Sequence, residues 1–335
     1  MPEWLIEHGI AEVRAILVDG EQVLATRLHW PGELQAGSDV EARLVTKLRG
    51  AQRGLARTAD GVEILVDHLP PRITEGEKVT LTVTRAPMAE IGRLKRAAGR
   101  ATPFVGDDGE RGGSLPAADG FLLDRDPDVK VTQLPTGRFL DRRWDELWHA
   151  ASMASLDFAG GNLIVSVTPA MTVIDIDGDA DPRDLALAAV SAIGRAIRWF
   201  DLAGNIGIDF PTLSAKADRR AVDTGLAAEL SDWPHERTAM NGFGFVQIVA
   251  RLERPSFVHR FAYDPAGMAA RFLMRQGERV EGSGPVLELT ANPAVAAKLT
   301  DAWLTELTRR TGRTVRVAAR DTVAITGGHA QIVER

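Results

Sequence analysis

The stretch from Met171 to Phe210, MTVIDIDGDADPRDLALAAVSAIGRAIRWFDLAGNIGIDF, constrains the fold more than any other part of the chain. It holds two short apolar runs of strand character, TVIDID and NIGIDF, and a longer run with helical periodicity between them. Two strands joined by a helix pair in parallel within one sheet through a right-handed crossover. The stretch therefore predicts a partly parallel sheet with helices on its faces.

The connecting helix carries its own start and stop signals. Asp181 is a typical N-cap residue, and Pro182 suits the first helical position. Apolar residues recur at helical spacing from Leu185 to Phe200, and Gly204 is a plausible stop. These signals predict one amphipathic helix between the two strands.

Three aspartates occupy related positions on the two strands. Side chains alternate along a strand, so Asp175 and Asp177 share one face of TVIDID. A right-handed crossover allows Asp209, at the end of the next strand, to face Asp175. Clustered carboxylates repel one another, and Mg²⁺, which prefers oxygen ligands, relieves that repulsion. The pattern predicts a Mg²⁺ site that grips a phosphodiester.

The same aspartates are consistent with other kinds of site. Aspartates at strand ends also cap helices or fix loops, and spacing alone leaves that alternative open. A calcium loop is excluded because Gly178 comes two positions early and no glutamate stands at the twelfth place. The segment DIDGD also resembles the nucleophile strand of haloacid-dehalogenase-like phosphatases, but no convincing set of that family's other residues follows.

Changes in the pattern of apolar and polar residues along the chain predict several structural parts. Alternation of apolar and polar residues on both sides of Asp19 and Gly20 predicts a strand pair, and short alternating runs over 38–86 predict a small barrel of about five strands. Trp144 and Trp148 occur at helical spacing, which favours a role in core packing. The fold class expected is mixed α+β or α/β. The expected parts are N-terminal strands joining the core (1–37), barrel (38–98), linker or trimmed sensor region (99–140), catalytic core (141–260) and C-terminal αβ subdomain (261–335).

Composition limits the classes of function and location. The chain of 335 residues contains no cysteine, which excludes disulfides, thiolate metal sites and cysteine nucleophiles. No apolar run reaches the length of a membrane span, and the N-terminus lacks signal-peptide features, so we expect a cytoplasmic protein with no membrane partner. The net charge of −6 argues against nucleic acid, but residues 41–100 hold twelve Lys and Arg against seven Asp and Glu.

Taken in order, these motifs resemble the catalytic core of the ribonuclease E/G family. That family carries T-x-x-I-D-I-N, a helix with I-A-R-x-x-R-x-x-D-L-x-G, and I-x-I-D-F. This chain has MTVIDID, IGRAIRWFDLAG and IGIDF in the same order. The resemblance continues through DRRAV, FGFVQI and RPS and into the tail, so it covers most of the chain.

The resemblance implies a fold and an activity. The fold is a ribonuclease-H-like mixed sheet with an inserted OB-type, S1-like barrel and a small C-terminal αβ unit. The activity is Mg²⁺-dependent endoribonuclease cleavage of single-stranded RNA, in RNA and rRNA processing or turnover, with Mn²⁺ as a possible substitute. In the family, Mg²⁺ is bound by two aspartates that match Asp175 and Asp209 of this chain, aided by an asparagine at the position where this chain has Asp177. The metal activates water against a phosphodiester.

The resemblance and local charge also point to residues for RNA. Arg195 and Arg198 match family arginines on the crossover helix, while Arg219 and Arg220 lie on the next helix. A solvated or ion-paired helix face is an equal alternative for each. Basic residues of the barrel are weaker candidates, namely Lys47, Arg49 and Arg53.

Departures from the family pattern support a second hypothesis. Without cysteine the family's zinc-linked dimer cannot form, so no zinc is expected, and much of the 5′-end sensor segment is missing. No Phe, Trp or Tyr lies between Pro31 and Pro103, where the family's barrel stacks bases. Gln247, Ala250 and Leu252 replace one acid and two arginines. The alternative is a catalytically weak or inactive RNA-binding or ribosome-assembly homologue.

Overall fold

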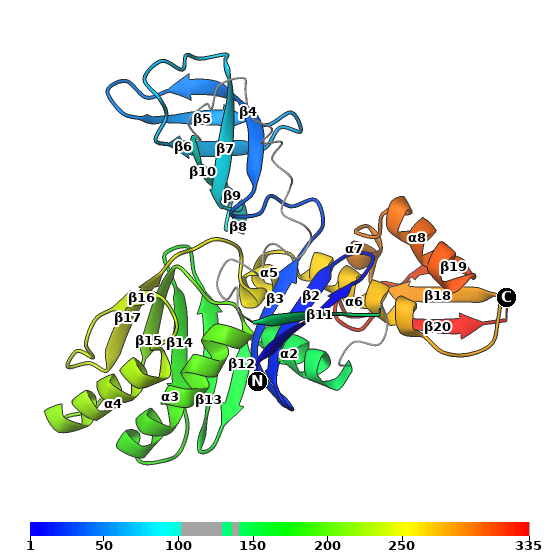
Figure 1. Ribbon diagram of the computed structural model, residues 1–335. Coiled ribbons are helices and arrows are strands. Elements are labelled where there is room, and N and C mark those ends of the chain that lie inside the picture. Colours follow the sequence, from blue (N-terminus) through cyan, green and yellow to red (C-terminus); the bar gives the residue numbers. More distant parts are fainter. Residues whose placement is uncertain (102–128, 136–140, 335) are drawn as a thin grey trace. The chain divides into compact units, whose positions relative to one another are not determined.

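The computed structural model describes residues 1–101, 129–135 and 141–334, with side chains in the last range from residue 144 onward (Figure 1). The chain divides into two compact units. The first comprises Met1–Pro31, Val129–Val249 and Ser256–Arg335, and the second comprises Gly32–Asp128 and Ala250–Pro255. Within the described ranges, no helix combines the length and apolar character needed to cross a bilayer.

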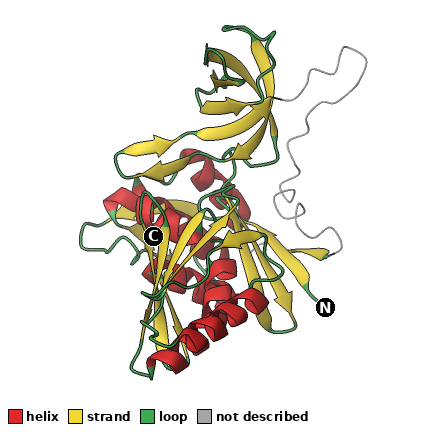
Figure 2. Ribbon diagram, turned by 90° about the vertical axis from the view of Figure 1, so that its left-hand side faces the viewer, coloured by secondary structure: helices red, strands yellow, loops and turns green. Residues whose placement is uncertain are grey.

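The second unit contains a closed five-stranded barrel in the order β10-β6-β5-β4-β7, as the short alternating runs predict. Figure 2 shows this unit as strands and loops. Leu44, Ile64 and Leu81 point inward and are fully buried, which the alternation of apolar and polar residues requires. A separate hairpin, β8-β9, follows β7. The strands are β4 (Asp39–Lys47), β5 (Arg53–Arg57), β6 (Glu63–Asp67), β7 (Lys78–Arg85), β8 (Met88–Glu90), β9 (Arg93–Lys95) and β10 (Ala97–Ala101).

The first unit is built around a six-stranded mixed sheet in the order β12-β13-β14-β15-β17-β16. The predicted parallel pair is present as β14 and β15, and β13 and β17 run antiparallel on either side. The mixed α+β class is therefore confirmed, and this sheet is compatible with the ribonuclease-H-like core. The strands are β12 (Ser155–Phe158), β13 (Gly161–Val167), β14 (Thr172–Asp177), β15 (Asn205–Asp209), β16 (His235–Arg237) and β17 (Phe245–Ala250).

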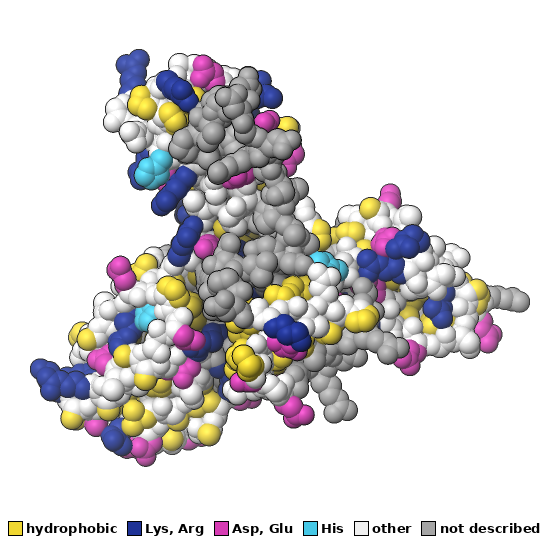
Figure 3. Space-filling view, viewed as in Figure 1, with side chains coloured by type: hydrophobic (Ala, Val, Ile, Leu, Met, Phe, Trp, Pro, Cys, Tyr) yellow, Lys and Arg dark blue, Asp and Glu magenta, His cyan; other side chains and the backbone are white. Residues whose placement is uncertain are grey.

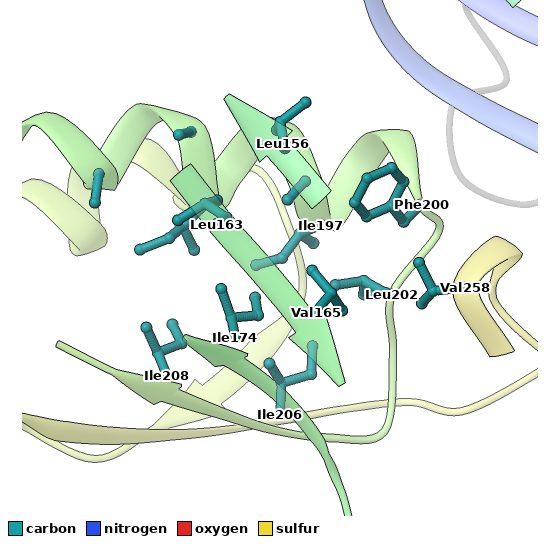
Figure 4. Close-up of a cluster of buried hydrophobic side chains, with 14 of the residues drawn as sticks. Leu156, Leu163, Val165, Ile174, Ile197, Phe200, Leu202, Ile206, Ile208 and Val258 are labelled. Atoms are coloured by element: carbon teal, nitrogen blue, oxygen red, sulfur yellow. The ribbon is translucent and has the colours of Figure 1, made fainter. Parts of the chain in front are cut away.

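Helices α3 (Pro182–Trp199) and α4 (Lys216–Glu229) cover one face of this sheet. The α3 helix begins as the sequence predicts, since Asp181 accepts a hydrogen bond from the Arg183 amide and Pro182 opens the first turn. Figure 4 shows the core that forms beneath it, where Ile174, Ile206 and Ile208 of the strands meet Ile197 of the helix. All four side chains are essentially inaccessible to water, so this face of the sheet is dedicated to packing.

The N-terminal segment forms three strands rather than the predicted pair. A turn in which the Gly9 amide donates to the Glu12 carbonyl splits the first run into two strands. A further strand in the expected linker region pairs in parallel with the first one. The resulting sheet has the order β11-β1-β2-β3. Its strands are β1 (Glu3–His8), β2 (Val13–Asp19), β3 (Gln22–His29) and β11 (Lys130–Leu134).

The C-terminal segment is a small αβ unit with its own hydrophobic cluster. A three-stranded sheet in the order β19-β18-β20 packs on helices through Leu273, Leu289 and Leu307, all buried. It belongs to the first compact unit. The elements are α5 (Phe257–Tyr263), α6 (Pro265–Arg279), β18 (Val286–Ala291), α7 (Pro293–Ala296), α8 (Asp301–Thr311), β19 (Thr314–Ala319) and β20 (His329–Val333).

Helix α2 (Asp141–Met153) and helix α6 hold the N-terminal strands through aromatic and ionic contacts. Trp148 of α2 stacks on Phe272 with ring centroids 4.4 Å apart, and Trp144 is almost fully buried, so the predicted core role of both tryptophans is confirmed. Beside Trp144, the buried Arg275 donates to Glu12 over 2.9 Å. Burial, and then the charge of neighbouring Arg14, lower the pKa of Arg275 to about 10.

Candidate active site

Asp175 and Asp209 lie next to each other on neighbouring strands. The parallel register of β14 and β15 places them directly opposite, two positions along from the pair Val173 and Gly207. Adjacent strands in a sheet are about 4.8 Å apart, so the two carboxylates share one small region of the sheet. Both side chains are exposed, whereas the intervening Ile174 is buried on the opposite face. The arrangement is the one that the alternation along TVIDID predicts.

Asp177 lies on the same face of the sheet, two residues beyond Asp175 along β14, and has no partner on β15. Its register partner is Asn162 of β13, because β15 ends its pairing at Asp209. The Asp177 carboxylate accepts a hydrogen bond of 2.9 Å from the Gly178 amide, and Asn162 donates to Asp157. In the described part of the chain no three acidic or histidine side chains group closely enough to hold a metal ion. The protein thus presents a carboxylate pair with Asp177 beside it.

The Asp175 and Asp209 side chains accept no hydrogen bond and form no ion pair within the described residues. Two neighbouring like charges repel each other, and no cation of the described residues pairs with either carboxylate to offset that repulsion. Exposed carboxylate oxygens fit the needs of Mg²⁺, which uses one or two protein carboxylates and completes its shell with water or phosphate oxygens. The residues present therefore fit a bound Mg²⁺ ion.

The sheet face around the pair is open to water in the first unit. The two helices that cover the sheet pack on its other face, through the cluster in Figure 4. On the carboxylate face, Ile164 of β13 is 42% exposed and Val249 of β17 is 48% exposed. A polymeric substrate can therefore reach this face of the unit without displacing a helix.

A tight loop from Asn241 to Phe245 lies against the end of β15. The Asn241 side chain accepts hydrogen bonds from the amides of Phe243 and Phe245, over 2.9 and 3.1 Å. The Gly244 carbonyl accepts from the Phe210 amide, one residue after Asp209. The sequence pattern MNGFGFVQIVARLE predicts one strand, but β17 begins only at Phe245, and this loop precedes it. The signal that would have found it is the Asn-Gly-Phe-Gly run, which is typical of a turn.

Gly244 has a backbone conformation that only glycine adopts easily there. Its φ is +90°, and an added Cβ would lie 2.4 Å from the Phe210 carbonyl oxygen. We expect Gly244→Ala to displace the loop from β15, to lower the free energy of unfolding by about 1–3 kcal/mol, and to reduce any activity of the site. Gly242→Ala is the matched control, because Gly242 has open space around its Cβ position. Urea unfolding of both variants measures the difference, and equal stabilities would show that the loop is not pinned.

The two arginines on the crossover helix do not face the carboxylates. Arg198 pairs with Glu229 over 2.9 Å and with Asp232 over 2.6 Å, so it joins α3 to the end of α4. Arg195 donates to the Asp157 carbonyl over 2.8 Å and lies over the Trp199 ring. Helix α3 packs on the opposite face of the sheet from Asp175. The structure therefore does not bring these arginines together with the aspartates.

The remaining predicted RNA-binding residues are scattered. In α4, Arg219 donates to the Leu213 and Ser214 carbonyls, whereas the Arg220 side chain is exposed and unpaired within the described residues. In the barrel unit, Lys47 donates to two carbonyls and Arg53 pairs with Asp67 over 2.7 Å. Arg49 is exposed in the turn after β4.

Several basic side chains of the barrel unit are paired with acidic ones. On the face drawn in Figure 3, Lys and Arg side chains of this unit (dark blue) occur together with Asp and Glu (magenta). The ion pairs explain the mixture, since Glu63 binds both Arg57 and Arg96 and its pKa is lowered by those hydrogen bonds. Among the described residues, Arg57 and Arg96 would have to leave Glu63 before they could bind phosphate groups.

No family model matches the chain. Over 113 residues the chain is 34% identical to ribonuclease G of Escherichia coli (strain K12), and the same identity is found with ribonuclease G of Shigella flexneri. The aligned part is 30% of this chain and 23% of those relatives, so less than a quarter of the relatives' length is matched. This similarity supports a distant relationship to ribonuclease G.

Proposed function

We propose that the protein is a Mg²⁺-dependent endoribonuclease acting on single-stranded RNA. The observation that carries the proposal is the register of Asp175 with Asp209 on the exposed face of a parallel strand pair. The similarity to ribonuclease G supports RNA as the substrate, although it covers only part of either chain. Mn²⁺ is the proposed substitute for Mg²⁺, and the proposal includes no cysteine-bound zinc, since the chain has no cysteine.

In this proposal the Asp175 and Asp209 carboxylates bind the ion directly. Asp177, two residues further along β14, accepts a hydrogen bond from a water molecule bound to the ion. When bound, Mg²⁺ polarises a phosphate oxygen and makes a bound water more acidic. The open sheet face orients the RNA backbone across the two strands. Of the basic residues, Arg220 and Arg49 remain available for phosphates, whereas Arg195, Arg198, Arg219, Lys47 and Arg53 would first have to release their present partners. We place this activity in the cytoplasm.

A second candidate function is RNA binding without cleavage, as in a ribosome-assembly homologue. It is favoured by the pairing of Arg198 with Glu229 and Asp232, which removes a predicted phosphate contact from the site. It is also favoured by Gln247, an amide where the family pattern has an acid, on the strand beside Gly207. An amide is a weaker ligand for Mg²⁺ than a carboxylate.

Metal removal and return test the primary proposal. Purified protein is incubated with end-labelled single-stranded RNA in EDTA, and then with excess Mg²⁺ or Mn²⁺. We expect internal cuts only when a divalent ion is present, because in this proposal the bound ion polarises the phosphate and makes its bound water more acidic. Cleavage that persists in EDTA, or no cleavage with either ion, would overturn the proposal. RNA binding in the absence of cleavage would support the second candidate.

A further inference from the structure

Phe243 is the most exposed aromatic group beside the candidate active site. Its side chain is 84% exposed, and its ring stacks on no other ring within the described residues. The loop that carries Phe243 is hydrogen-bonded to the end of β15: the Phe210 amide, one residue after Asp209, donates to the Gly244 carbonyl. Large apolar side chains are usually removed from water, so an exposed ring at this position has surface available for a ligand.

The backbone that presents Phe243 is fixed on both sides. The Phe243 amide is held by the Asn241 side chain, and Gly244 is bound to the Phe210 amide in a conformation that excludes a Cβ. A ring on a preorganised loop loses little conformational freedom when a partner binds. The loop is therefore preorganised to present the Phe243 ring to a ligand.

A second aromatic ring, two residues further along, lies on the carboxylate face of the sheet. Phe245 is the register partner of Asp209, and its ring lies so close over Gly207 that a Cβ there would come within 2.5 Å of it. Only the absence of a side chain at Gly207 lets the ring lie against the strand. Two aromatic residues thus flank the end of β15 that carries Asp209, where a phosphate of bound RNA would sit.

We propose that Phe243 is the stacking platform for an unpaired base next to the scissile phosphate of single-stranded RNA. The inference rests on the proposed function and deepens it by naming the residue that selects single strands. A base within a duplex already stacks on its neighbours, so an exposed ring favours unpaired bases. The barrel segment has no Phe, Trp or Tyr between Pro31 and Pro103, so this inference assigns base stacking to a ring elsewhere in the chain.

The test measures equilibrium binding of a fluorescent single-stranded RNA, without divalent ion, at several salt concentrations. We expect Phe243→Ala to weaken binding about tenfold at every salt concentration, because stacking contributes through ring contact. The slope of log affinity against log salt should not change, because phosphate contacts set that slope. Phe243→Trp should retain the affinity, whereas Phe243→Leu, which is apolar but not flat, should not.

Controls separate this inference from the proposed function. Gly242→Ala, in the same loop with open space around it, should bind RNA as the wild type does. Thermal unfolding should be unchanged in Phe243→Ala because the ring makes no buried contact. Equal affinity of Phe243→Ala and wild type, or full affinity in Phe243→Leu, would overturn the inference even if the wild type cleaves RNA. Conversely, the predicted binding pattern without cleavage in Mg²⁺ would uphold stacking and reject only the nuclease activity.

Discussion

Asp209→Asn is expected to lower the rate of RNA cleavage in Mg²⁺ by roughly a thousandfold. The substitution keeps the size of the side chain but removes one of two charges that Asp175 and Asp209 bring together. Stabilisation of transition-state charge by a bound metal is worth several kcal/mol, and about 1.4 kcal/mol corresponds to a tenfold change in rate. The initial rate of cleavage of a labelled single-stranded RNA, at saturating Mg²⁺, measures the effect.

Matched variants make this result specific. Asp175→Asn should lower the cleavage rate as much as Asp209→Asn does. Asp177→Asn should lower it less, because Asp177 lies two residues beyond Asp175 on β14 and pairs with Asn162 instead of with β15. Asp321→Asn, a change of an exposed carboxylate in the C-terminal segment, should leave the rate unchanged. If Asp209→Asn retained more than about a tenth of the wild-type rate, the carboxylate pair would not be the catalytic centre.

Arg275→Ala is expected to lower the free energy of unfolding of the first unit by about 3–5 kcal/mol. Arg275 is only 2% exposed and binds Glu12 over 2.9 Å, with Asp145 3.5 Å away. Removing it leaves the buried Glu12 beside Arg14, at 3.4 Å, as its remaining cation among the described residues, and opens a space beside Trp144. A buried carboxylate that loses its close partner retains most of its desolvation cost.

Urea unfolding followed by tryptophan fluorescence measures this change selectively, since all seven tryptophans lie in the first unit. Arg309→Ala provides the control. Arg309 pairs with Glu306 on the surface of α8, where water and salt screen the interaction, and its loss should not shift the unfolding midpoint measurably. If both variants unfolded at the same urea concentration, the buried ion pair would contribute no more than a surface pair.

Local patterns predicted much of the mixed sheet. The alternation of TVIDID placed Asp175 on one face and Ile174 on the other, and the Asp181-Pro182 start of α3 was read directly from residue types. The closed barrel followed from short alternating runs separated by turns. Such patterns work because the side-chain period of a helix or strand is a local property of the backbone.

Partners distant in the sequence could not be predicted in the same way. Arg198 was expected to contact RNA, yet Glu229 and Asp232, on the following helix, bind it instead. Residues 99–140 were expected to be a linker, yet Lys130–Leu134 forms a strand that pairs in parallel with β1. Nothing in the local pattern of either segment specifies the neighbour that it meets.

The sequence by itself determined the strand–helix–strand unit and the shared face of its aspartates, because alternation and capping depend on neighbouring residues. Tertiary structure alone decided that Asp175 meets Asp209 in register while Asp177 meets Asn162. It also decided that Gly244 docks on Phe210 and that Arg275 is buried against Glu12, 263 positions earlier. The physical reason is that register, docking and buried ion pairs depend on which surfaces meet in space, and the energies that select them arise only once the chain has packed.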